Sequence, residues 1–184
     1  MVTQQLKILD CTLRDGGYYN NWDFDQDLVE LYLKSMEDAS IDVIEIGFRS
    51  PPKKSFMGPY VYSLDDHIKS LPLPKNIIIG VMINANEYLQ AAEEPVKMIN
   101  KLFQRCDESP VKLVRIAINF DKVLKAEVLA KELKRLGYEV GLNMMQSHGK
   151  EEQHYKQVAK QIEEWGCVDV LYFADSLGSM GPSE

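Results

Sequence analysis

Short apolar runs alternate with longer amphipathic stretches along the chain. Six apolar runs predict buried strands, at residues 6–9, 42–48, 76–84, 111–119, 139–145 and 167–174. Each run is followed by a helix-like or loop segment, so that one unit of strand and connection takes roughly 30 residues. Repeated units of this size predict a parallel sheet with right-handed crossover connections, and the sequence is therefore typical of the α/β class.

Two kinds of parallel sheet fit this pattern. A closed (β/α)₈ barrel takes about 250 residues, more than the 184 of this chain. An open doubly wound sheet fits the length, but its first strand is followed by a glycine-rich phosphate loop that opens a helix. Here Gly16 and Gly17 are followed by Tyr-Tyr-Asn-Asn, which is not typical of a helix start and disfavours the open sheet.

The first long amphipathic stretch predicts a helix with one buried face. Asp23 or Asp25 can cap its start. Leu28, Leu31 and Met36 recur at helical spacing, and we expect them to face the core.

A long connection runs from Arg49 to Ser63 and contains three prolines, three cations and three aromatic residues. Connections of this length inside compact domains are often binding loops. A mobile surface loop fits the same composition, and the sequence leaves both interpretations open.

Composition and charge narrow the classes of partner. The apolar content is 45%, the charged content is 27% and the net charge is −7, values that are ordinary for one soluble globular domain spanning residues 1–184. An acidic chain is disfavoured for binding nucleic acid or an anionic membrane, because both require a cationic face. A small anionic substrate held by one arginine or one metal ion is still allowed.

Cysteine usage and the apolar runs indicate a cytoplasmic protein. Cys11, Cys106 and Cys167 are too few and too scattered for a disulfide framework or a zinc cluster. The first five residues lack the charged and apolar regions of a signal peptide. The longest apolar run, residues 77–83, is too short to span a bilayer.

Candidate chemistry gathers where the first predicted strand ends. Asp10, Thr12 and Arg14 fall at alternate positions, so an extended backbone would direct all three to one side. We expect Gly16 and Gly17 to end this strand in a turn. Asp15 would then lie at the carboxyl end of the strand, where parallel α/β folds place their chemistry.

An arginine beside a carboxylate at such an edge can bind a metal ion with the carboxylate and a developing oxyanion with the guanidinium. A structural Arg14–Asp15 ion pair is the alternative. Glu45 shares one face of the second strand with Val43 and Gly47, and a carboxylate among apolar neighbours is either paired or functional.

Three segments resemble the metal-dependent aldolase, lyase and synthase superfamily that includes HMG-CoA lyase, isopropylmalate synthase and 4-hydroxy-2-oxovalerate aldolase. Asp-Cys-Thr-Leu-Arg-Asp-Gly at residues 10–16 resembles the D-x-T-L-R-D-G signature of that superfamily. Val-Ile-Glu-Ile-Gly-Phe at residues 43–48 resembles its second strand, and residues 173–180 resemble the D-S-x-G-x-M stretch that closes its sixth strand. The segments lie in family order and span nearly the whole chain.

The resemblance implies a fold, a cofactor and roles for particular residues. The fold would be an incomplete TIM-type barrel, the first six βα units of an N-terminal part of the catalytic barrel. Asp15 would be a ligand of Mg²⁺ or Mn²⁺, Arg14 the cation that stabilises an enolate, and Glu45 a support of the active site that takes part in proton handling. Asp175, Ser176 and Gly178 would line the site for a 2-oxo acid, although a structural turn capped by Asp175 fits equally.

Asn143 is a further, weaker candidate for substrate binding, because it lies near the end of the fifth strand.

Three features depart from the family pattern. The family completes its metal site with a His-x-His pair, whereas His67, His148 and His154 are separated here and are expected to be solvated.

Tyr18 stands where related aldolases carry a histidine base. A phenol with a pKa of about 10 is a poorer base, so that Tyr18 is expected to orient the substrate or donate a proton. No coenzyme A site is recognisable.

The leading hypothesis is a divalent-metal-dependent aldolase or lyase acting on a 2-oxo acid through a metal-stabilised enolate. A Claisen-type acyl-transfer synthase and a non-catalytic barrel used for partner binding are the alternatives. We expect the chain to be part of a longer protein and inactive alone. Six strands cannot close an eight-stranded barrel, so the open edges predict a homodimer.

Overall fold

The computed structural model describes residues 6–176, 178–179 and 181. The strands are β1 (Leu9–Asp10), β2 (Val43–Phe48), β3 (Ile78–Asn84), β4 (Leu113–Asn119), β5 (Glu139–Met145) and β6 (Val170–Phe173). The α-helices are α1 (Thr12–Gly16), α2 (Gln26–Asp38), α3 (Asp65–Lys69), α4 (Ala85–Leu89), α5 (Pro95–Leu102), α6 (Glu127–Arg135) and α7 (Glu152–Glu164). Three 3₁₀ turns complete the order: η1 (Gly17–Tyr19), η2 (Pro59–Val61) and η3 (Phe120–Ala126).

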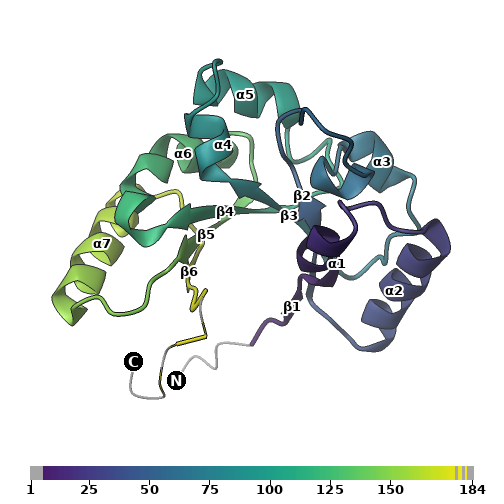
Figure 1. Ribbon diagram of the computed structural model, residues 1–184, viewed down its shortest axis with the longest axis horizontal. Helices are drawn as coiled ribbons and strands as arrows, with labels where there is room; N and C mark the ends of the chain where they lie inside the picture. Colours follow the sequence, from purple (N-terminus) through teal and green to yellow (C-terminus); the bar gives the residue numbers. More distant parts are fainter. Residues whose placement is uncertain (1–5, 177, 180, 182–184) are drawn as a thin grey trace.

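The six strands form one parallel sheet in sequence order, from β1 at one edge to β6 at the other. Figure 1 shows that the sheet curls into an open arc with α2, α3, α5, α6 and α7 on its convex side. This architecture confirms the predicted incomplete TIM-type barrel of α/β class. The carboxyl ends of neighbouring parallel strands meet along one rim, so side chains there can act together.

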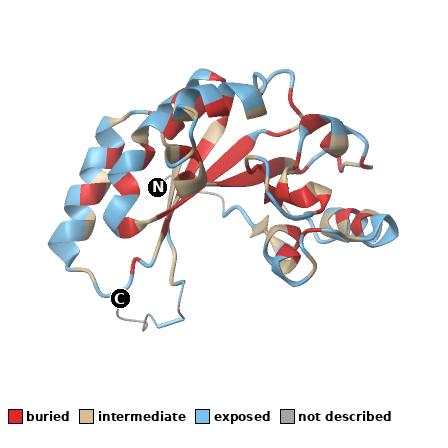
Figure 2. Cartoon of the chain, turned by 45° about the horizontal axis from the view of Figure 1, so that its top comes forward, coloured by how far each residue is buried: buried red, intermediate tan, exposed pale blue. Residues whose placement is uncertain are grey.

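The central strands β2, β3 and β4 are buried on both faces, as expected for a parallel sheet covered by helices. All six residues of β2 are buried, and β4 is buried at every position except Asn119. Figure 2 shows this buried band running through the middle of the molecule beneath exposed helix surfaces. A charged residue within such a strand therefore has few ways to contact water.

Helix α2 begins at the predicted cap but buries a different face from the one expected. The Asp25 carboxylate accepts hydrogen bonds from the backbone N–H groups of Asp27 and Leu28, as an N-cap does. Leu28 and Leu31 are 54% and 62% exposed, whereas Val29 and Leu33 are fully buried. Our prediction was wrong for Leu28 and Leu31, because Val29 and Leu33, four residues apart, form the buried row. Met36 packs against the core, as expected.

The segment after β1 is a helical turn, and the predicted extended backbone across Thr12 and Arg14 was wrong. The Asp10 carboxylate accepts hydrogen bonds from the backbone N–H and hydroxyl of Thr12, at 2.9 and 3.1 Å, and from the Tyr32 hydroxyl at 2.5 Å. These contacts bend the chain directly after the strand. Arg14 and Asp15 consequently project from α1 rather than from a strand.

Gly16 and Gly17 were expected to form a turn with backbone angles that other residues do not adopt. Both have ordinary right-handed helical angles instead. Gly17 is required for a different reason. A Cβ atom at this position would lie 2.0 Å from Trp22 Cδ1. The indole can pack on the turn only because residue 17 has no side chain.

The connection from Arg49 to Ser63 is packed at both ends. Arg49 is fully buried, donates to the Ser63 carbonyl oxygen from Nε and Nη2 at 3.1 and 2.6 Å, and pairs with Asp65 at 2.6 Å. Ser109 also donates to Asp65, at 2.9 Å. This network fixes the loop against the outer helices, and the mobile-loop interpretation does not hold for these ends.

Candidate active site

A buried carboxylate between two arginines is the centre of the candidate site. Glu45 of β2 is fully buried. Arg14 Nε donates to its Oε1 at 2.8 Å, and Arg115 Nη1 donates to its Oε2 at 2.9 Å. The register of β2 against β3 shifts between Glu45 and Phe48, and such irregularities often occur beside active sites because they re-aim side chains.

The carboxylates beside Arg14 hold its guanidinium in the ionised form. Burial acts to lower the pKa of the Arg14 guanidinium, but the charge and hydrogen bond of Glu45 outweigh it and the pKa is raised. Asp15 adds to this effect through its ion pair with Arg14 Nη1. Arg14, Asp15 and Glu45 thus lie together in the structure; the sequence predicts that Asp175 converges with them, and that part stays a prediction.

Arg115 is the member of the cluster to which the sequence assigned no role. Its Nη2 donates to Asn143 Oδ1 at 3.3 Å, and its guanidinium carbon lies 4.4 Å from the centre of the Tyr172 ring. Gly141 leaves space for the Arg115 side chain, because a Cβ at residue 141 would lie 2.9 Å from Arg115 Cγ. The available signal was a cation interrupting the otherwise apolar fourth strand.

Asp15 lies at the exposed side of the cluster. Its side chain is 61% exposed, whereas that of Arg14 is 13% exposed. Cys11 Sγ lies 3.9 Å from Asp15 Oδ2, and burial raises the pKa of the Cys11 thiol. A carboxylate open to solvent beside a buried cation can accept a further cation or a hydrogen-bond donor.

The donor set fits Mg²⁺ or Mn²⁺ only in part. Asp15 offers the hard oxygen that these ions prefer. No group of three or more histidine, cysteine, aspartate or glutamate residues suited to a metal ion occurs among residues 6–176, 178–179 and 181. Asp15 therefore fits as one ligand of such an ion, and the described residues do not form a complete site.

Tyr18 lies in an aromatic group at the rim. Its ring is 4.7 Å from the Trp22 ring and 6.2 Å from the Phe48 ring, both edge to face. Trp22 Nε1 donates to the Arg14 carbonyl oxygen at 2.9 Å. The Arg14 guanidinium carbon lies 5.7 Å from the centre of the Phe48 ring, so this group borders the charged cluster.

The residues after β6 lie in a turn next to the end of β5. The Ser176 hydroxyl accepts from the Gln146 backbone N–H at 3.1 Å. Ser179 Oγ donates to Asp175 Oδ1 at 3.4 Å, and the Gly178 N–H donates to the Asp175 carbonyl oxygen. Leu177 and Met180 of the motif lie outside the described residues. A role for Asp175, Ser176 and Gly178 in binding substrate is still a prediction.

One histidine differs from the expectation of a solvated surface role. His67 packs edge to face on Tyr60 at 4.9 Å, and its buried Nε2 has no hydrogen-bond partner in the described part of the chain. Burial lowers the pKa of the His67 imidazole. His148 and His154 are exposed, as predicted.

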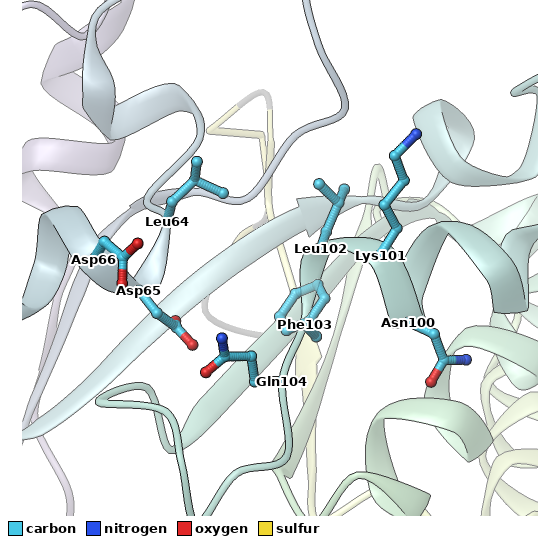
Figure 3. Close-up of a pocket in the computed structure, with 8 residues that line it drawn as sticks. All are labelled: Leu64, Asp65, Asp66, Asn100, Lys101, Leu102, Phe103 and Gln104. Carbon is cyan, nitrogen blue, oxygen red and sulfur yellow. The ribbon is translucent and has the colours of Figure 1, made fainter.

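Two of the cavities are lined in part by residues between Phe48 and Asp66. One, of about 210 Å³, is formed by the start of α3 and the end of α5 among the outer helices, and Figure 3 shows Asp65 and Gln104 directed toward each other across it. The other, of about 170 Å³, is lined by Tyr18, Trp22 and Phe48. Of these two cavities, only the second is lined by the aromatic residues that border the charged cluster.

The HMGL-like family model matches residues 5–184, and the chain belongs to the HMGL-like family. It is 25% identical over its whole length to 4-hydroxy-2-oxovalerate aldolase of Geobacillus genomosp. 3, and covers 52% of that protein. It is 26% identical over 98% of its length to the 4-hydroxy-2-oxovalerate aldolase of Pelotomaculum thermopropionicum, and covers 51% of it. The chain thus spans about half the length of these curated relatives.

A solved structure supports both the fold and the family. The crystal structure of the N-terminal domain of a provisionally assigned aldolase from Bacteroides vulgatus superposes with a TM-score of 0.83 at 34% identity. The match covers 97% of this chain and 57% of that one.

Within the described residues, no helix combines the length and apolar character needed to cross a bilayer.

Proposed function

We propose that the complete protein is a divalent-metal-dependent aldolase that cleaves or forms a carbon–carbon bond in a 2-oxo acid. The observation that carries this proposal is the buried Glu45 carboxylate held between Arg14 and Arg115, with Asp15 exposed beside Arg14. Curated relatives named 4-hydroxy-2-oxovalerate aldolase support the same reaction class.

Cleavage of a 4-hydroxy-2-oxo acid breaks the bond between C3 and C4. The C4 hydroxyl loses its proton and becomes an aldehyde, while the bonding electrons form an enolate at C2 and C3. The enolate then takes up a proton at C3, which yields the shorter 2-oxo acid. The barrier falls when a fixed cation faces the oxygen on which negative charge develops.

Arg14 is the residue we assign to the enolate oxygen. No hydrogen bond among the described residues occupies its Nη2, whereas Nε and Nη1 are held by Glu45 and Asp15. Two fixed donors orient the third, so that the guanidinium needs little reorganisation during the reaction. Glu45 is the residue that positions Arg14, and Tyr18 is our candidate for orienting the substrate or donating a proton.

Asp15 is the proposed metal ligand from this chain. When bound, Mg²⁺ or Mn²⁺ would supply a Lewis acid that polarises the 2-oxo group. Its other protein ligands would come from outside the described residues. Asn143, Asp175, Ser176 and Gly178 are the proposed contacts to the remainder of the substrate.

The test substitutes Asp15 by asparagine in the complete protein. We expect Asp15→Asn to lower kcat for a 4-hydroxy-2-oxo acid by about 10²-fold or more and to weaken Mn²⁺ binding measured by calorimetry. The melting temperature should change little, because the Asp15 side chain is largely exposed.

Asp23→Asn is the matched control, since Asp23 is an exposed aspartate of the same segment. Loss of activity in both variants, or turnover only with acetyl-CoA, would contradict the aldolase assignment. Lack of turnover with any 2-oxo acid in the unmodified protein would support a partner-binding barrel instead.

We also propose that the protein is a cytoplasmic homodimer. The three cysteines are free thiols, which suits a reducing compartment. The strands β1 and β6 end the sheet at its two edges, and unpaired edges favour association.

A further inference from the structure

Three side chains of the candidate site come from alternate strands of the sheet. Glu45 of β2 accepts from Arg115 of β4 at 2.9 Å, and the Arg115 guanidinium carbon lies 4.4 Å from the ring centre of Tyr172 of β6. These contacts place all three side chains on one face of the sheet, whereas the alternate residues Ile44 and Ile116 are fully buried in the core under the helices. The shared face is therefore the concave side of the arc in Figure 1.

Such a row is unusual for the interior of a TIM-type barrel. Each interior layer of these barrels consists of side chains from alternate strands, and bulky branched apolar residues dominate it. Here the layer contains an acid, a base and an aromatic ring. A buried ion pair often stabilises a fold no better than apolar residues of similar volume, because its charges must be desolvated. Stability alone therefore does not account for Glu45 and Arg115 at these positions.

Three contacts fix the guanidinium of Arg115. Its Nη1 donates to Glu45, its Nη2 donates to Asn143 Oδ1 at 3.3 Å, and the group lies over the Tyr172 ring. Gly141 of β5 lets the ring and the arginine meet, because a Cβ at residue 141 would lie 2.9 Å from Arg115 Cγ and 3.2 Å from Tyr172 Cε2. Without the ring, the long arginine side chain would regain rotamers that these contacts now exclude.

The position of Arg115 is transmitted to Arg14 through Glu45. The Glu45 side chain is fully buried, and its Oε1 accepts from Arg14 Nε at 2.8 Å while its Oε2 accepts from Arg115. The terminal torsion of a glutamate is soft, so one donor does not fix the plane of the carboxylate. Two donors on opposite oxygens do fix it, and water cannot replace Arg115 at a fully buried carboxylate.

We propose, on the basis of the proposed aldolase function, that Arg115 is a positioning residue for the reaction and that Tyr172 holds it in place. Through Glu45, the two residues fix the direction in which Arg14 faces the enolate oxygen. Neither residue touches the substrate in this role. The functional site thus extends over the concave face from α1 to β6.

The experiment replaces Tyr172 in the complete protein and measures cleavage of 4-hydroxy-2-oxopentanoate with Mn²⁺ present. Tyr172→Leu removes the aromatic face, and we expect kcat to fall about tenfold, the size of a partly desolvated cation–π contact. KM should stay within about twofold, because a contact that acts only on the developing enolate changes kcat rather than substrate binding. Tyr172→Phe keeps the ring and should restore kcat to within about twofold.

Arg115→Lys tests the same path at the arginine. A lysine keeps the positive charge but has no planar fork with which to bind Glu45 and Asn143 together. We expect kcat to fall about tenfold or more, again with little change in KM. Thermal melts of each variant show that the protein is folded.

Phe173→Leu is the matched control, because Phe173 is the next aromatic residue of β6 and its ring contacts Tyr155. Alternation places it on the other face of the sheet from Tyr172. It should leave kcat and KM near those of the unmodified protein. An unchanged kcat in Tyr172→Leu, a failure of Tyr172→Phe to restore kcat, or an equal loss in Phe173→Leu overturns the proposal. A rise in KM in place of the fall in kcat overturns it as well.

Failure of the aldolase function is recognised by a second readout that needs no turnover. Hydrogen exchange of the Arg14 Nε–H is followed by NMR with isotope-labelled arginine, and Arg14→Lys identifies its resonance. We expect Tyr172→Leu and Arg115→Lys to speed this exchange about tenfold, and Tyr172→Phe and Phe173→Leu to leave it unchanged. This pattern in a protein that cleaves no 2-oxo acid supports the positioning role although the reaction class is wrong. Equal exchange in all variants overturns the positioning role itself.

Discussion

At the scale of single residues, Glu45 links the fold to the chemistry. A carboxylate inside a parallel strand is costly unless charged partners satisfy both of its oxygens. Arg14 and Arg115 do so from α1 and β4, two elements that are distant in sequence. The same contacts that stabilise Glu45 also fix the direction of Arg14.

Substituting Glu45 by glutamine tests this coupling. Glu45→Gln leaves two largely buried guanidinium groups without their shared anion, and we expect a loss of about 3–5 kcal/mol in the free energy of unfolding. Urea denaturation measures the change. Glu127→Gln removes an exposed partner of Lys131 and should cost much less, because solvent screens exposed ion pairs. Similar losses in the two variants would contradict the coupling.

His67 gives a prediction about pH. Burial lowers its pKa from the ordinary value of 6.5 in the folded state, so the unfolded chain binds the proton more readily. Stability is therefore fully present above about pH 6.5 and falls as the pH drops through the folded-state pKa. His67→Phe, which keeps a ring against Tyr60, should flatten this dependence in thermal melts between pH 5 and about pH 8.

His154→Phe is the control for this measurement, because it leaves His67 unchanged. It should keep the acid sensitivity of the unmodified chain. An unchanged slope in His67→Phe would show that other groups cause the loss of stability in acid.

At the scale of elements, the sequence predicted the strands well and the turns poorly. Apolar runs such as β3 and β4 are buried on both faces whatever their neighbours are, so composition alone locates them. The turn at Thr12–Gly16 depends on hydrogen bonds from Thr12 and Tyr32 to Asp10. The bonds from Thr12 are local, but the bond from Tyr32 comes from 22 residues away and leaves no local signal. The alternation of Asp10, Thr12 and Arg14 suggested a strand instead.

Some residues of the candidate site could likewise be predicted from the sequence, and others could not. The family motif identified Arg14, Asp15 and Glu45, which meet in the structure. Arg115 received no role, because its contacts depend on the register of β4 against β5, where it lies opposite Gly141. Pairing register cannot be read from an apolar run, so the space that Gly141 leaves was not predictable.

Gly141→Ala tests the importance of that space. The new Cβ would displace Arg115 at its Cγ atom, and overpacking of this kind costs about 1–3 kcal/mol. We expect a lower melting temperature together with weaker catalysis by the complete protein, since Arg115 would no longer hold Glu45.

Gly80→Ala is a matched control in β3, where the nearest atoms to an added Cβ are at an ordinary 3.5 Å. It should leave both measurements near those of the unmodified protein. Equal effects of the two substitutions would mean that a strand glycine matters for general reasons rather than through Arg115.

At the scale of the whole molecule, the open arc explains why the site is incomplete. Asp15 and Arg14 lie beside β1, which is one edge of the sheet, while the turn containing Ser176 follows β6 at the other edge. In a closed barrel further strands would join these edges and could bring additional ligands to the same rim. The curated relatives are about twice as long as this chain.

The open edges lead to a prediction about self-association of the 184-residue chain. Ile8, directly before the edge strand β1, is 51% exposed, and an apolar edge favours pairing with another copy. We expect sedimentation velocity to show a dimer that dissociates on dilution. Ile8→Lys should raise the dissociation constant of this dimer about tenfold or more, because a charge at a strand edge blocks pairing. Leu31→Lys, at a position on α2 that is 62% exposed, should have no effect. A monomer at all concentrations, or equal weakening by both substitutions, would contradict association through this edge.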